Sequence, residues 1–160
     1  MGTPSTPSTA VAALEAVFGP ASDAGFGSAT FTGPTGADLE PVARATYRRF
    51  VGAKWERFGE AAWMGPWRRV YARPAGAARD VVAELAALPD REARSSAGAM
   101  VDGLEDAARG KAALAAAFDA TDVTRFEVYN AGDGEAMSGV VLVGARGPAD
   151  PVTIVAFLLD

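Results

Sequence analysis

The last quarter of the chain, from Asp119 onward, has a pattern of apolar positions that predicts three β-strands. Residues 124–130 alternate between apolar and polar, residues 139–146 are rich in valine, and residues 151–159 are almost entirely apolar. Short links between these segments favour an antiparallel meander in which residues 140–143 form the middle strand. We therefore expect a three-stranded sheet at the C-terminal end.

The final predicted strand is apolar at both odd and even positions. Thr153 is its only polar residue between Val152 and Leu159. A strand with one face in water should alternate between apolar and polar residues. Because this strand does not, both of its faces must be covered. Either helices cover both faces of the sheet here, or one face forms a homodimer contact, because a long apolar edge left open would promote aggregation.

The first 118 residues show the spacing of amphipathic helices instead. Asp90 is expected to cap one of them, Gly65-Pro66 to end another, and Gly110 to interrupt the last. Their predicted ranges are residues 10–17, 38–62, 75–88 and 90–118.

Two segments among these helices are candidates for a fourth strand, one around Phe31 and one around Trp67. Residues 67–73 fit a short strand or a further helical turn equally well. The sequence thus predicts an α+β fold, with N-terminal helices packed on a C-terminal antiparallel meander of three or four strands. Residues 1–8, rich in Pro, Ser and Thr, are expected to be a flexible tail, and residues 9–160 a single domain.

The amino-acid composition excludes several kinds of site and catalytic chemistry. The chain contains no cysteine and no histidine, which excludes disulfides, thiolate chemistry, Cys/His zinc sites and His-dependent catalytic triads. We find no catalytic motif and expect no cofactor and no metal. No apolar run approaches the roughly 20 residues of a membrane helix and no signal peptide is recognisable, so we expect a cytoplasmic protein without a membrane partner.

Charge is distributed unevenly. Residues 44–73, which we name the Arg/Trp-rich segment, hold all three tryptophans and eight of the fifteen basic residues. With two glutamates, the segment has a charge of +6, so the remainder of a chain of net charge −5 must have −11. That acidic remainder argues against a nucleic-acid-binding function, because such binding needs a broad basic face.

Our first functional hypothesis is a non-catalytic protein that engages an acidic or anionic protein partner through the Arg/Trp-rich segment. Interface hot spots are enriched in Trp, Tyr and Arg. One alternative places the aromatic residues in the core or at its rim and the arginines in water. Two others are that the segment contacts the protein's own acidic parts, or that it forms a phosphate or nucleic-acid surface. The residues expected to form the binding surface are Trp63, Trp67, Arg68, Arg69 and Arg73.

Two alternatives belong to other classes. A pocket between the long helix and the sheet would make the protein a small-ligand-binding protein or a hydrolase. Lys54 falls within an apolar helical stripe, and Asp133 and Glu135 lie in a Gly-rich loop next to Tyr129, so these four residues are the candidates for that pocket. The loop lacks the calcium-binding pattern. The third hypothesis is an inhibitor or immunity-type protein that acts through its acidic surface.

Overall fold

In the part of the chain that the structure describes, the three C-terminal strands form the centre of a five-stranded antiparallel sheet. The computed structural model describes residues 7–58, 66–132, 138–147 and 150–159. Strand β4 (Ser138–Ala145) lies between β3 (Arg125–Ala131) and β5 (Val152–Leu159), as the meander prediction requires. Both candidate segments contribute an edge strand, because β1 (Gly27–Gly33) pairs with β5 and β2 (Trp67–Ala72) pairs with β3. The α+β class is confirmed, but the sheet has five strands rather than three or four.

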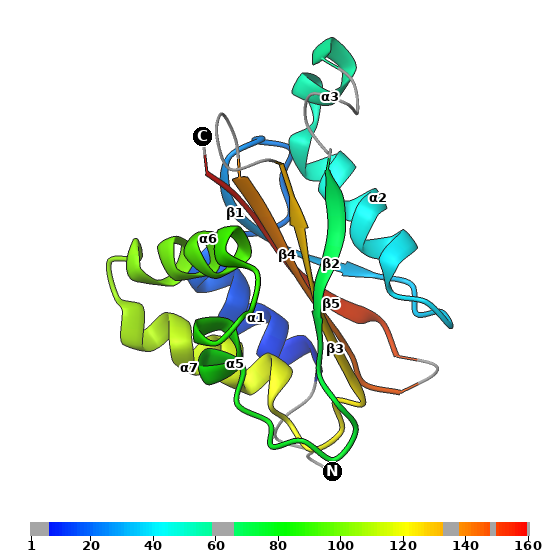
Figure 1. Cartoon of the computed structure of the whole chain (residues 1–160), viewed down its shortest axis with the longest axis vertical. Coiled ribbons are helices and arrows are strands. Elements are labelled where there is room, and N and C mark those ends of the chain that lie inside the picture. The colour runs from blue at the N-terminus through cyan, green and yellow to red at the C-terminus, as the bar shows by residue number, and fades with distance from the viewer. Residues whose placement is uncertain (1–6, 59–65, 133–137, 148–149, 160) are drawn as a thin grey trace.

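Helices cover both faces of this sheet (Figure 1). On one face lie α1 (Pro7–Phe18), α5 (Val81–Ala86), α6 (Arg91–Asp102) and α7 (Ala107–Phe118), which we name the four-helix layer. On the other face lies α2 (Glu40–Val51), followed by the short α3 (Ala53–Phe58). The sheet therefore separates two hydrophobic cores, and the predicted order of helices first and strands last does not describe the arrangement in space.

Strand β5 contributes to both cores. Val155 and Phe157 pack with the four-helix layer, whereas Ile154 and Ala156 pack with α2. Its two edges are paired with β1 and β4. Helical cover of both faces, one of the two predicted explanations for its apolar character, is thus the observed one. The expected homodimer through this strand stays untested, but β5 offers no open edge for it.

The predicted helix over residues 38–62 is broken at Gly52. This glycine has φ of +63°, and a Cβ there would lie 2.7 Å from the backbone oxygen of Asp23. Only glycine combines that backbone conformation with so close a neighbour. The chain therefore ends α2 at Val51 and starts α3 at Ala53, and the rest of the predicted helix beyond Phe58 lies outside the described residues.

The third predicted helix begins later than expected. Residues 75–80 are not helical, because the helix starts only where Asp80 can cap it, with its side chain accepting a hydrogen bond from the Ala83 amide at 3.2 Å. The predicted cap at Asp90 is confirmed, since its carboxylate accepts from the Ala93 amide at 2.9 Å. Side-chain caps of this kind satisfy amides that the first helical turn leaves free.

The long helix after Asp90 breaks at Gly103 rather than at Gly110. Gly103 follows the last residue of α6, and Asp106 caps the start of α7. Gly110 lies inside α7, where a Cβ would stand 2.3 Å from a methyl carbon of Leu104. Gly110 therefore permits close packing instead of ending a helix.

Two glycines in β4 set how closely each layer approaches the sheet. Gly139 faces α2, and a Cβ there would lie 2.3 Å from the Tyr47 hydroxyl. Gly144 faces the four-helix layer, and a Cβ there would lie 2.6 Å from Cδ1 of Phe118. Each glycine thus makes room for an aromatic ring that is fully buried.

We predict that Gly144→Ala lowers the free energy of unfolding by about 1–3 kcal/mol, because the added methyl group must displace the Phe118 ring. Gly98→Ala in α6 is the matched control, since a Cβ there meets no atom within 4 Å. It should raise the free energy of unfolding by about 1 kcal/mol through helix propensity alone. Urea denaturation measures both changes, and a stabilising Gly144→Ala would contradict the described packing of Phe118.

Candidate functional site

The end of the Arg/Trp-rich segment forms β2, an edge strand whose side chains go to both sides of the sheet. Trp67 turns toward α2 and donates a hydrogen bond from Nε1 to Glu40 at 3.0 Å. Arg68 turns toward the four-helix layer and reaches Asp90. A bulge between Arg69 and Tyr71 changes the alternation, so that Val70 and Tyr71 both pack with the four-helix layer. Bulges and charged residues are common protections of an edge strand against pairing with other chains.

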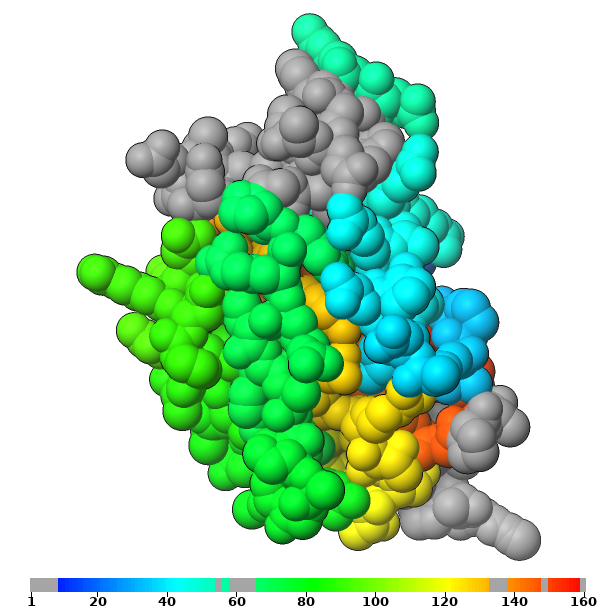
Figure 2. All heavy atoms as spheres, turned by 45° about the vertical axis from the view of Figure 1, so that its right-hand side comes forward, coloured from blue at the N-terminus to red at the C-terminus, as the bar shows by residue number. Residues whose placement is uncertain are grey.

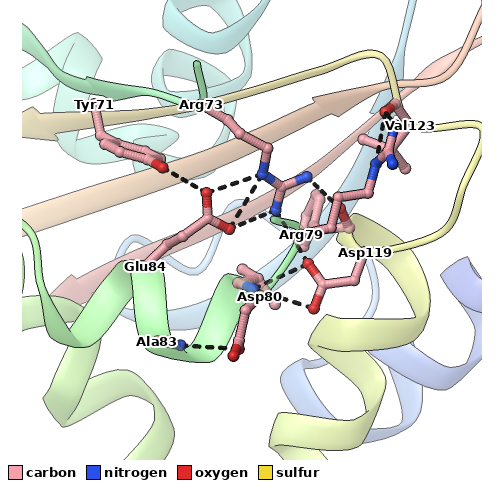
Figure 3. Close-up of polar contacts among 10 residues, drawn as sticks. Tyr71, Arg73, Arg79, Asp80, Ala83, Glu84, Asp119 and Val123 are labelled. Atoms are coloured by element: carbon pink, nitrogen blue, oxygen red, sulfur yellow. Dashed lines mark hydrogen bonds and ion pairs between the residues drawn. The ribbon is translucent and has the colours of Figure 1, made fainter. Parts of the chain in front are cut away.

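Arg73, one of the predicted surface residues, is instead the centre of a buried polar network (Figure 3). Its side chain is 7% exposed, and it donates to Glu84 from Nη2 at 2.6 Å and from Nε at 2.9 Å. It also donates to the Phe118 carbonyl at 2.8 Å and to Asp119 at 3.0 Å. The guanidinium is therefore paired inside the protein and joins β2 to α5 and to the end of α7.

The remaining members of the network complete its hydrogen bonds. The Tyr71 hydroxyl donates to Glu84 at 2.5 Å, and the Val81 amide donates to the Asp119 carboxylate at 2.9 Å. Burial and the bond to Glu84 raise the pKa of Tyr71 to about 12. Burial alone would raise the pKa of Glu84, but hydrogen bonds from Arg73 and Tyr71 hold it below its ordinary value. Burial raises the pKa of Asp119.

Arg68 is also paired within the chain. Its Nη2 and Nε atoms donate to Asp90 at 2.8 Å and 3.0 Å, and Glu92 lies 3.7 Å from Nη2. Burial would raise the pKa of Asp90, but hydrogen bonds from the Ala93 amide and from Arg68 hold it below its ordinary value. Arg68 thus holds the carboxylate that caps α6 in place. This is a contact of the segment with the protein's own acidic parts, one of the alternatives that the sequence left open.

Trp67 belongs to an aromatic cluster between α2 and the sheet. Its ring stacks on Tyr129 with centroids 5.2 Å apart and an interplanar angle of 15°, and it contacts Tyr47 with centroids 6.0 Å apart. Trp67 is partly buried, while Tyr47 and Tyr129 are fully buried. Stacked rings of this kind contribute to packing beyond the area they bury. Trp67 therefore acts at the rim of the α2 core.

Tyr129, a candidate for the predicted pocket, has its hydroxyl occupied. It donates to Glu127, which also lies 3.6 Å from Arg69. Burial and the bond to Glu127 raise the pKa of Tyr129. Asp133, Glu135 and Trp63 lie outside the described residues, as does the side chain of Lys54, so the predicted pocket stays untested.

Three further exposed basic residues of the Arg/Trp-rich segment lie on α2. Arg44, Arg48 and Arg49 are exposed, and we name them the basic face of α2. Arg44 lies over the Trp67 ring at 5.8 Å and Arg49 over the Phe31 ring at 5.3 Å. Arg69, with 54% of its side chain exposed, lies on the same side of the sheet.

An open concavity of about 770 Å³ adjoins the basic face. It lies where the end of α2, the start of α3 and the loop before β1 meet, and Arg48 and Arg49 line it together with Asp23 and Glu56. Figure 2 shows the side of the molecule on which α2 and β2 lie next to each other, with part of β3 visible between them. Our predicted binding surface did not include these three arginines, although all three lie within the Arg/Trp-rich segment.

Within the described residues, no cluster of three or more carboxylates is placed to hold a metal ion. None of the described helices has the length and apolarity needed to cross a membrane. No protein-family model, curated protein or solved structure matches the chain. Any functional conclusion therefore has to come from the geometry and charge of its own surface.

We predict that Glu84→Gln lowers the free energy of unfolding by about 3 kcal/mol at neutral pH, because it removes the main partner of a buried guanidinium. The folded state lowers the pKa of Glu84, so its contribution is complete above the ordinary value of 4.5 and is lost as the pH falls through the folded value. The difference between wild type and Glu84→Gln should therefore shrink below about pH 4.

Denaturation followed at several pH values measures this difference. Glu105→Gln, which changes an exposed carboxylate before α7, is the matched control and should alter stability by less than about 0.5 kcal/mol. If Glu84→Gln were as mild as the control, the network would not stabilise the fold as described.

Proposed function

We propose that the protein is a non-catalytic binding protein that engages an acidic partner through the basic face of α2, with Arg69 of β2 beside it. The observation behind this proposal is that three arginines stand exposed on one helix. All three belong to the Arg/Trp-rich segment, so the proposal keeps that segment as the binding element and moves the contact from the end of the segment to its beginning.

Helix geometry supports a shared surface. Arg44 and Arg48 are four residues apart, and side chains with that spacing are neighbours on a helix, about 6 Å apart along the axis. Arg49 follows Arg48 directly and widens the face toward β1, whose Phe31 it covers. The arrangement supplies several positive charges at a spacing that matches carboxylates along a polypeptide.

Arg68 and Arg73 are less suited to an external partner. Arg73 is buried between Glu84 and Asp119, and Arg68 is bonded to Asp90. Releasing either one would leave a carboxylate inside the protein without its counter-charge, which is strongly unfavourable. A partner can approach α2 without breaking these pairs.

The carboxylates near the basic face favour an extended acidic partner over a compact polyanion. Asp23 and Glu56 line the same concavity as Arg48 and Arg49. They would repel a multiply charged anion such as pyrophosphate if it sat inside the concavity. An acidic peptide can instead place its carboxylates along the line from Arg44 to Arg49 and avoid both residues.

The proposal predicts that Arg44→Ala/Arg48→Ala/Arg49→Ala weakens the binding of a synthetic poly-glutamate peptide roughly tenfold, since exposed ion pairs contribute about 0.2–1 kcal/mol each. Fluorescence anisotropy of the labelled peptide at low ionic strength measures the affinity. Binding by wild type should weaken as salt is added, because exposed charges are screened. Pyrophosphate should compete poorly with the peptide.

The matched control is Arg91→Ala/Arg94→Ala/Arg109→Ala, which removes three exposed arginines from the four-helix layer. It lowers the net charge by the same amount and should leave peptide affinity within about twofold of wild type. Equal losses in the two triple variants would show that only net charge matters and would contradict a site on α2. Thermal unfolding of each variant confirms that it is folded.

A further inference from the structure

The four-helix layer contains a hollow on the side of the sheet opposite to the basic face. Its volume is about 150 Å³, and it opens between α5, α6 and α7. Leu85, Ala97, Val101 and Leu114 form its buried lining, and Val82 is partly buried beside them. The hollow is therefore a mostly apolar recess within a helical layer, with no residue in common with the α2 surface.

Gly98 lines this hollow, and no contact within the protein requires a glycine at this position. It lies in the middle of α6, where glycine is unfavourable relative to alanine. A Cβ at Gly98 would meet no atom within 4 Å, and its φ is not in the left-handed region. Neither close packing nor backbone conformation requires glycine here. What its missing side chain does provide is space in the hollow.

The rim of the hollow is charged. Arg94 and Lys111 are exposed there, together with Asp102. Arg94 uses Nη1 to donate to the Leu88 carbonyl at 2.8 Å, which holds its guanidinium close to the protein. Among the described residues, no hydrogen bond or ion pair involves the Lys111 ammonium. The rim thus has two positive charges, on Arg94 and Lys111, and one negative charge, on Asp102. This excess of one positive charge favours a ligand with a single negative charge.

We propose that this hollow binds a small amphipathic carboxylate, with its hydrocarbon tail against the apolar lining and its carboxylate at Lys111. An apolar cavity of this volume accepts a molecule of about six carbon atoms. A short aliphatic or phenyl-substituted monocarboxylic acid fits both the size and the charge of the recess, and the inference does not depend on the function proposed for α2.

Three six-carbon probes that differ only in their head group test the proposal: hexanoate, 1-hexanol and hexylamine. Each is titrated into the ¹⁵N-labelled full chain while amide shifts are followed by NMR. We expect saturable shifts at Ala97, Gly98 and Leu114, with hexanoate binding roughly two- to fivefold more tightly than 1-hexanol, the contribution of one exposed ion pair. Hexylamine should bind most weakly.

Two variants separate the roles of the tail and the head group. Gly98→Leu should abolish binding of all probes, because its side chain occupies the hollow. Lys111→Gln should reduce the affinity for hexanoate to that for 1-hexanol and leave 1-hexanol unchanged. Ser95→Leu, an exposed position on α6 outside the hollow, is the control for an added leucine and should bind like wild type.

Thermal unfolding shows whether Gly98→Leu is still folded when it loses binding. If the space beside Gly98 is open, this variant should melt no lower than wild type. The proposal is overturned if no probe gives saturable shifts at these amides, or if Gly98→Leu is folded and still binds hexanoate. It is also overturned if hexylamine binds as tightly as hexanoate, because the rim would then not select a carboxylate.

Discussion

The whole arrangement depends on the need to bury both faces of β4 and β5. Their side chains are apolar in both directions, so a single helical layer would leave one face of the sheet in water. The helices therefore divide into two groups, with α2 on one face and the four-helix layer on the other (Figure 1). Gly139 and Gly144 let the rings of Tyr47 and Phe118 approach β4 from opposite sides. The edge strands β1 and β2 then protect the flanks of this doubly covered centre.

The charged residues are distributed unevenly between the two layers. The region from Asp80 to Asp122, which includes α5, α6 and α7, has nine acidic residues against four basic residues. Strand β2 lies beside this region. Arg68 of β2 is paired with Asp90, and Arg73, which directly follows β2, is paired with Glu84 and Asp119. These pairs are interior or half-buried, so they hold the layer to the sheet. On the opposite side of the sheet, the basic face of α2 is exposed at the surface.

Two surfaces of different chemistry thus occupy the two layers. The basic face of α2 is open and charged, and it suits a contact with carboxylates spaced along a polypeptide. The hollow beside Gly98 is small and apolar, and it suits a compact hydrocarbon group with one charged end. Because the sheet and both hydrophobic cores separate them, a change at either surface should leave the other intact.

Local pattern and composition were enough to predict the strand meander, the need for cover on both faces of β5, the cap at Asp90, and the exclusion of His- and Cys-dependent chemistry. A sequence displays such features directly. Which arginines stay in solvent was set by contacts between distant parts of the fold. Arg73 meets Asp119 across 46 positions of sequence, and Arg68 meets Asp90 across 22, so no local pattern could reveal either pair. The break at Gly52 likewise depends on the approach of Asp23, a neighbour that only the folded chain brings there. A basic segment that looked uniform in sequence therefore separates into two parts: Arg68 and Arg73, which are paired with carboxylates of the four-helix layer and its flanking residues, and an exposed face on α2. The burial of each charge depends on what the fold packs against it.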